Sequence, residues 1–343
     1  MTTLIRSLAV VAAAVALGAG WLYYTINYSV PTIGPDPVEV RVEPGDSLAS
    51  VARKLRQQNA ITNRWFFLLW ARVHGAEKRI HQGLYRFETG VTAREVLDRL
   101  VNGKAVYYSV TIPEGLTVKE IAMLLDKLEI ADKDIFLREA ANLSLLASLG
   151  LHDKGLEGYL FPSTYHFTPG TAAKEIITIM AEQFRKVSLP LLMQRPPSMR
   201  LSTHEILTLA SIIEKETGVP EERAWVSAVF HNRLKQQMPL QSDPTVIYGA
   251  KDFNGNLTRK DLQEANPYNT YRIAALPPGP ICNPSVASIK AALEPADVPY
   301  LYFVSKNDGT HLFSETIEAH NRAVKIYQPV RQTSHQSRKA SPR

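Results

Sequence analysis

The hydrophobic pattern predicts an amphipathic helix after Ser202, where Ser202 and Glu205 fit a capping box. Four apolar residues recur at the i, i+3, i+4, i+7 spacing of one helix face: Ile206, Leu209, Ala210 and Ile213. The next position on this face is Glu216, whereas Glu214 lies roughly 200° away around a regular helix. We therefore expect Glu214 and Lys215 to face solvent or a rim, and Glu216 to close the buried stripe.

The expected position of Glu216 has a chemical consequence. A carboxyl group against apolar surface loses hydration, so its charged form is disfavoured and its pKa rises. Gly218, as the C′ residue, and Pro220 are expected to end the helix, which places Glu216 in the last turn, where the helix dipole raises the pKa further. A raised pKa suits a general acid near neutral pH. The alternative is a structural Glu capped by a nearby Arg or by backbone amides.

The N-terminus carries an apolar run over residues 8 to about 24, preceded by Arg6. Its length is at the short end for a membrane span. Its far end has three aromatic residues typical of a membrane interface: Trp21, Tyr23 and Tyr24. The charge before the run favours a cytoplasmic N-terminus with the rest of the chain outside. The alternative is a signal peptide cleaved near Ala19, and we favour an uncleaved anchor because aromatic residues follow that point directly.

The first half of the chain repeats a strand, a turn glycine and an amphipathic helix. The four units cover residues 40–55, 85–100, 110–125 and 165–180, and the first helix is expected to be capped by Asp46 or Ser47. Because their spacing is unequal, we interpret them as two modules of two units each rather than as a solenoid.

The first module, residues 38–103, follows a Pro-rich linker at residues 31–37. Its stretch VEPGDSLASVARKL resembles the LysM type, a small βααβ unit that binds carbohydrate. The alternative is a spacer domain that binds nothing, since a fold does not fix a function. The second module is expected at about residues 108–186, inside a larger mixed α+β domain over residues 104–330.

The remaining pattern alternates helices with irregular polar segments, which completes the prediction of an α+β fold. Helices are expected at residues 172–186, 220–237, 285–293 and 316–327. A strand at residues 300–304 is expected to turn at 307–309 and to return from His311. Two Pro-containing loops are expected at residues 239–249 and 276–285, where binding groups tend to lie.

Composition narrows the classes of function. The 343 residues are 45% hydrophobic and 21% charged, as in ordinary globular proteins. Part of the net charge of +6 comes from the tail at residues 331–343, which is expected to be disordered. The sequence has no basic stripe with interleaved aromatic residues, so it does not predict a nucleic-acid partner. The single cysteine, Cys282, excludes an intramolecular disulfide framework and Cys-rich metal sites. The histidines show no HExxH spacing, so we expect no metal or cofactor.

Several sequence blocks carry a family resemblance: ASIIEKET, VFHNRL, LQSDPTVIYG, NTY, LPPGPICNP and YLYFVSKNDGTHLFS. Together they resemble the endolytic murein transglycosylases, the YceG-like family. The resemblance implies a single-pass inner-membrane protein whose LysM-like module and catalytic domain face the cell wall. It implies cleavage of glycan strands between N-acetylmuramic acid and N-acetylglucosamine, which leaves a 1,6-anhydro end. It also implies peptidoglycan synthases of the penicillin-binding type as partners, and a role in ending nascent strands.

The catalytic Glu of this family falls on Glu216, which the helix-face argument reaches independently. As general acid, Glu216 would protonate the glycosidic oxygen and then, as base, take the proton of the muramic acid C6 hydroxyl as it closes on C1. Where the family commonly has Asp in EGYLFPDTY, this chain has Ser163, which argues that the reaction needs no acid there.

Seven further residues are candidates for holding the sugars or orienting the acid: Glu157, Asn232, Gln241, Asp243, Tyr248, Asn269 and Tyr271. Tyr248 is expected to offer a stacking surface, and Glu157, between glycines and beside aromatic residues, to orient substrate or Glu216. For each, the alternative is a hydrogen bond that structures a loop. Two rival functions stay open: a hydrolase with Asp243 or Glu157 as second carboxylate, and a scaffold that binds the wall and positions synthases.

Overall fold

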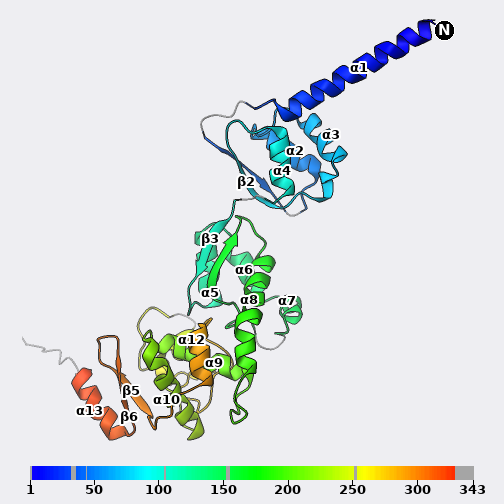
Figure 1. Ribbon diagram of the computed structural model, residues 1–343. Helices are drawn as coiled ribbons and strands as arrows, with labels where there is room; N and C mark the ends of the chain where they lie inside the picture. Colours follow the sequence, from blue (N-terminus) through cyan, green and yellow to red (C-terminus); the bar gives the residue numbers. More distant parts are fainter. Residues whose placement is uncertain are drawn as a thin grey trace, which may run out of the picture. The chain divides into compact units, whose positions relative to one another are not determined.

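The computed structural model describes residues 2–31, 36–43, 45–103, 106–151, 155–250 and 253–328, with side chains from residue 6 onward. In these residues the fold is α+β, as predicted, mostly helical with three two-stranded sheets (Figure 1). The chain forms two compact units. The first comprises Met1–Val110, Leu125–Asp132 and Thr164–Ala172, and the second comprises the remaining residues. The predicted domain boundaries stay predictions, and the tail at 331–343 lies outside the described residues.

The chain begins with the long apolar helix α1, Thr2–Asn27. Within it, Arg6–Asn27 has a mean hydropathy of 1.7 and only 11% of its most apolar window is buried, so it is long and apolar enough to cross a membrane. A membrane anchor and a signal sequence share these properties. The last turns of α1 pack against α3 and α4 of the same unit, where Thr25 and Ile26 are buried.

A βααβ module follows, in the predicted order: β1 (Val38–Val42), α2 (Leu48–Gln57), α3 (Arg64–Val73) and β2 (Gly83–Phe87), then α4 (Ala93–Val101). The strands pair antiparallel from Val38 opposite Phe87 to Val42 opposite Gly83. Their inward side chains and the apolar faces of α2 and α4 form one core. Ser47 caps α2 through the Ser50 N–H, as one of the two predicted alternatives.

The repeated strand–glycine–helix pattern is present in the backbone. The unit glycines Gly45, Gly90, Gly115 and Gly170 have φ values of 85°, 95°, 77° and 81°, where a side chain would be strained. The later repeats supply β3 (Tyr108–Ile112), α5 (Val118–Lys127), β4 (Ser163–Phe167) and α8 (Ala173–Met193). The sequence did not predict α6 (Lys133–Ala140) or α7 (Leu143–Ser148), and it ended α8 too early. Packing carries α8 past Pro190, since Leu192 is fully buried.

The centre of the second unit is α9, Thr203–Glu216, which begins at the predicted capping box of Ser202 and Glu205. It packs against α8, α10 (Arg223–Lys235), α11 (Asp243–Gly249) and α12 (Val286–Leu293). All residues from Ile206 to Ile213 are buried, so the expected single apolar stripe was too narrow. Small polar side chains allow this burial because they bond to the helix backbone: Ser211 donates to the Thr208 carbonyl at 2.7 Å.

The C-terminal part of this unit is a hairpin and a helix, as predicted. Strands β5 (Tyr302–Ser305) and β6 (His311–Ser314) pair antiparallel, and α13 covers Ile317–Tyr327 after the cap at Thr316. Two other expectations were wrong. Residues 239–249, expected to be irregular, contain α11, in whose first turn Pro244 needs no hydrogen-bond partner. The expected helix at 220–237 is a 3₁₀ turn, Pro220–Glu222, followed by the shorter α10.

Candidate active site

Glu216 is the last helical residue of α9, as the sequence predicts. The helix ends because Thr217 adopts an extended conformation; Gly218 is not in the left-handed region, so its expected role as C′ residue was wrong. The partly exposed carboxyl group of Glu216 accepts a short hydrogen bond from the Ser242 hydroxyl, which lies just before α11. Contact between α9 and α11 therefore brings the candidate acid to the loop at residues 240–243.

The surroundings of Glu216 raise its pKa to about 7. Burial makes the largest contribution, since it disfavours the charged form, and the nearby Asp243 carboxylate adds to it. The Ser242 hydrogen bond and the electrostatic interactions with His311 and Arg233 lower this pKa. Near neutral pH the group therefore exchanges readily between acid and base forms, as a general acid–base catalyst requires.

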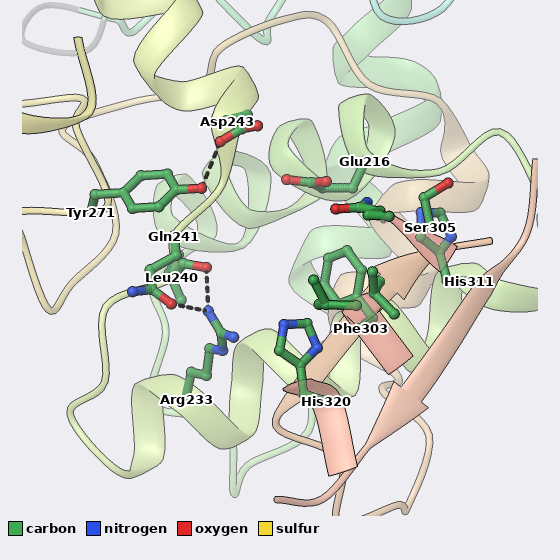
Figure 2. A pocket seen from close by; sticks show the side chains of 13 residues that line it. Glu216, Arg233, Leu240, Gln241, Asp243, Tyr271, Phe303, Ser305, His311 and His320 are labelled. Atoms are coloured by element: carbon green, nitrogen blue, oxygen red, sulfur yellow. Dashed lines mark hydrogen bonds between the residues drawn. The ribbon is translucent and has the colours of Figure 1, made fainter. Parts of the chain in front are cut away.

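Glu216 opens into a cleft of about 390 Å³ (Figure 2). One side is formed by Gln241 in the loop before α11, by Asp243 at the start of α11, and by Tyr271. The other side is formed by the β5–β6 hairpin and α13, with Phe303, His311 and His320. Three of the seven predicted binding residues, Gln241, Asp243 and Tyr271, thus share the cleft with the candidate acid.

Two hydrogen bonds organise these residues. The Tyr271 hydroxyl donates to Asp243 Oδ1 at 2.6 Å (Figure 2). Gln241 has a φ of 51°, a left-handed conformation that is rare for a residue with a side chain, and its N–H donates to the Thr270 carbonyl at 3.0 Å. Strained backbone of this kind is often found where side chains must face a ligand.

The sequence reasoning missed the contribution of Arg233, a buried residue of α10. Its Nε donates to the Leu301 carbonyl at 2.7 Å, and its Nη1 donates to the Leu240 carbonyl at 2.8 Å and to Gln241 Oε1 at 3.3 Å. One guanidinium therefore fixes both walls of the cleft, which its planar set of five donors allows. Arg233 was present in the VFHNRL block, but its link to the second wall is the Leu301 carbonyl, 68 residues further along the chain.

The sequence also missed the pair formed by Glu222 and His311. The buried Glu222 carboxylate accepts from the His311 N–H at 2.9 Å and contacts His311 Nδ1 at 2.7 Å. This pairing fixes the orientation of the imidazole ring at the cleft wall. Neither residue has a local sequence signal, because the pair joins positions 89 residues apart.

Four predicted binding residues lie outside the cleft. Glu157 accepts hydrogen bonds from the Val118 N–H at 3.1 Å, from the Tyr248 hydroxyl at 3.2 Å and from Asn283 Nδ2 at 3.2 Å. Burial raises the pKa of Glu157 to about 7. Asn232 donates to the Val298 and Tyr300 carbonyls. These contacts match the alternative in which such residues structure loops.

The other two residues outside the cleft are Tyr248, which bonds to Glu157, and Asn269. Asn269 is almost fully buried. Its Nδ2 lies within 3.2 Å of three carbonyl oxygens, those of Asp261, Leu262 and Glu264. Sugar binding by any residue of the seven stays a prediction, but only Gln241, Asp243 and Tyr271 are placed to contact a ligand that reaches Glu216.

We expected Glu214 to face solvent or a rim, and the structure places it half-buried against the start of α12. Its carboxylate accepts from the Ser285 N–H at 2.9 Å and from the Ser285 hydroxyl at 2.5 Å, at the N-terminus of α12. Lys215 is exposed as expected, and its Nζ donates to the Gly115 carbonyl at 3.1 Å. The two acids of Glu-Lys-Glu thus serve different purposes: Glu214 joins two helices, and Glu216 faces the cleft.

Fold and site together define an α+β protein with an apolar N-terminal helix and one carboxyl group of raised pKa in a polar cleft. Among the described residues, no group of three His, Cys, Asp or Glu side chains could hold a metal ion. Residues 40–326 match the YceG-like family, and the chain belongs to this family.

Named relatives give the comparison more detail. The chain is 32% identical over 306 residues to an endolytic murein transglycosylase of Bacillus subtilis, with 84% of each protein covered. It is 28% identical to an endolytic murein transglycosylase of Streptococcus pneumoniae, covering 84% of this chain and 58% of that protein. A crystal structure of a YceG-like protein from Listeria monocytogenes is similar at a TM-score of 0.56 and 31% identity, over 84% of this chain and 99% of that one.

Proposed function

We propose that this protein is an endolytic lytic transglycosylase that cleaves peptidoglycan strands between N-acetylmuramic acid and N-acetylglucosamine. The observation that carries the proposal is the raised pKa of Glu216 at a polar cleft, in a chain whose relatives are named endolytic murein transglycosylase. The product would be a strand with a 1,6-anhydromuramic acid end.

In the proposed reaction, protonated Glu216 donates its proton to the glycosidic oxygen as the bond to C1 breaks, and positive charge develops on the muramic acid ring. The resulting carboxylate then takes the proton of the C6 hydroxyl while that oxygen bonds to C1. Protons balance, because Glu216 ends as it began. The hydrogen bond from Ser242 stabilises the carboxylate between the two steps. Gln241 and Tyr271 are the proposed sugar contacts.

The second candidate is a hydrolase in which Asp243 is the second carboxylate, since it lies in the same cleft. A hydrolase needs a carboxylate free to act as nucleophile or to activate water. One oxygen of Asp243 already accepts the Tyr271 hydroxyl at 2.6 Å, which favours a positioning role instead. A purely wall-binding scaffold would have no need of a carboxyl group with a pKa near neutrality.

We further propose that α1 is an uncleaved anchor in the inner membrane, with its N-terminus in the cytoplasm and the chain that follows α1 outside. The apolar length of α1 and the exposed aromatic residues at its far end support this. Such a location would bring the enzyme close to nascent strands and to the penicillin-binding synthases that make them. Its proposed role is to end strand growth, with the βααβ module as a carbohydrate-binding unit.

The test is a mass-spectrometric digest of uncrosslinked glycan strands by the full chain in detergent. Wild type is compared with Glu216→Gln and with Glu182→Gln, an exposed carboxyl on α8 that serves as the matched control. We expect internal fragments with anhydro ends from wild type and Glu182→Gln, and a loss of about a hundred- to ten-thousand-fold for Glu216→Gln. Fragments with free reducing ends would establish hydrolysis. Equal cleavage by Glu216→Gln would overturn the assigned acid.

A further inference from the structure

Helix α3 of the first unit exposes large apolar side chains on its outer face. Trp65, Leu69 and Val73 lie at i, i+4 and i+8, so they form one stripe, and their exposed fractions are 64%, 50% and 72%. The inner face of α3 is also apolar, because Phe67, Leu68 and Ala71 are buried in the module core. A helix that is apolar on both faces is normally covered on both.

The neighbouring helices show that this exposure is particular to α3. The exposed positions of α2 are Ala49, Arg53, Arg56 and Gln57. Those of α4 are Arg94, Glu95 and Asp98. The same small module therefore builds two helices with polar outer faces and one with an apolar outer face. Contiguous apolar surface of this kind marks an interaction site in soluble and membrane proteins alike.

The charges of α3 are positive only. The helix has no acidic residue, and it carries Arg64 in its first turn and Arg72 in its last, both exposed. The Arg64 guanidinium lies 4.5 Å from the centre of the Trp65 ring. A helix with Trp and Leu on one face and Arg at its margins has the composition of helices that lie in the interface of an anionic bilayer.

The position of α3 along α1 supplies the second, independent observation. The last turns of α1 pack against α3 and α4, with Leu22, Thr25 and Ile26 covered by the module. Asn27 Oδ1 also accepts a hydrogen bond from Arg94 at 3.2 Å. The covered residues alternate with three exposed aromatic residues of the interfacial type, Trp21, Tyr23 and Tyr24. If α1 spans the membrane, α3 lies at the depth of the lipid headgroups.

We propose that the outer face of α3, defined by Trp65, Leu69 and Val73, docks into the headgroup region of the bilayer that α1 crosses. This inference rests on the proposed anchor and goes beyond it: the βααβ module is held on the membrane surface instead of moving freely at the end of α1. Its arginines would pair with anionic headgroups while the apolar stripe enters the acyl boundary.

The experiment uses the full chain in nanodiscs of phosphatidylcholine with a minority of phosphatidylglycerol. A cysteine introduced by Leu69→Cys carries an environment-sensitive nitrobenzoxadiazole label; the native Cys282 is fully buried and does not compete. Quenching is measured with lipids that bear a doxyl group near the headgroup end of the acyl chain for position 69, and near its methyl end for position 17, which lies close to the middle of the apolar run. The matched control is Ala49→Cys on the polar face of α2, and Leu17→Cys, exposed on α1, reports on the anchor itself.

We expect blue-shifted emission and a loss of about half of the fluorescence for the labels at positions 17 and 69, and neither change at position 49. Quenching at 17 but not at 69 would overturn the docking proposal and leave the anchor intact. No quenching at either position would overturn both. A blue shift at 69 without quenching by lipid would show that another protein surface, such as a second copy, covers the stripe, and would also overturn the proposal.

Discussion

At the scale of single residues, the properties of Glu216 come from opposing neighbours rather than from burial alone. The carboxylate of Asp243 raises its pKa, and the charge of His311 lowers it. Both side chains lie in the same cleft, so each can be changed without disturbing the apolar packing behind α9. Burial makes the largest contribution to the Glu216 pKa, and the balance between these two neighbours adjusts the pH at which the acid form is lost.

Replacing Asp243 and replacing His311 are expected to shift the pH dependence of strand cleavage in opposite directions. The active form of Glu216 is protonated, so activity falls as pH rises through its pKa of about 7. Asp243→Asn removes a negative charge, lowers this pKa and moves the alkaline limb to lower pH. His311→Gln removes the electrostatic contribution of His311 that lowers this pKa, and moves the limb to higher pH. The measurement is kcat/KM against pH, and limbs that move together would contradict this electrostatic account.

How far the sequence predicts this site depends on where each contact lies. Glu216 follows from the periodicity of its own helix, and Gln241 and Asp243 from polar residues in a Pro-containing segment. Ser242 lies between those two and could have been found by the same signal. The roles of Arg233 and His311 in joining the cleft walls could not, because each depends on a distant partner, Leu301 at 68 residues and Glu222 at 89 residues.

At the scale of elements, a small group of hydrogen bonds centred on Ser285 joins α9 to α12. Ser285 caps α12 by accepting from the Ser288 N–H at 3.2 Å, and its hydroxyl donates to Glu214. The same serine therefore caps the start of one helix and satisfies the half-buried carboxylate of another. Helical periodicity predicted where Glu214 points around α9, but it could not reveal that α12 begins there.

Ser285→Ala is expected to destabilise the α9–α12 contact by about 1–3 kcal/mol, because the helix cap and one partner of the Glu214 carboxylate are lost together. The matched control is Ser47→Ala, which removes the cap of α2 but leaves no carboxylate without a partner. This control is expected to cost about 1 kcal/mol. Hydrogen exchange of the α12 and α2 amides measures each effect locally. A cost at Ser285 no larger than that at Ser47 would rule out the proposed coupling.

At the scale of the whole chain, elements were predicted better than their packing. Hydrophobic periodicity and turn glycines identified the two strand–helix units of the first module, the central helix and the C-terminal hairpin, whereas the βααβ order came from the LysM resemblance. Prediction from local patterns failed for α11. This Pro-containing polar segment is helical because tertiary contacts with α9 stabilise its two turns. It also failed for α9 itself, where neighbours on every side bury residues that a single helix face would leave exposed. Both errors arise from tertiary contacts that local patterns do not encode.

In the second unit, desolvation raises the pKa values of the partly buried Glu157 and Glu216 carboxyl groups, and the stability of this unit should depend on pH accordingly. Glu157 and Glu216 each have a folded pKa of about 7, against an ordinary value of 4.5. Between these values the folded state binds more protons than the unfolded state, so the free energy of unfolding falls as pH rises from about 4.5 to about 7 and then levels off.

Gln mimics the protonated form. Glu157→Gln and Glu216→Gln should therefore gain stability relative to wild type across this window, and their effects should add, because the two groups share no hydrogen-bond partner among the contacts described. Hydrogen exchange of the α10 amides in the full chain in detergent would measure this in the second unit, with Glu182→Gln as the exposed control. A difference between variant and wild type that stays constant with pH would show that these carboxyl groups ionise normally in the folded protein.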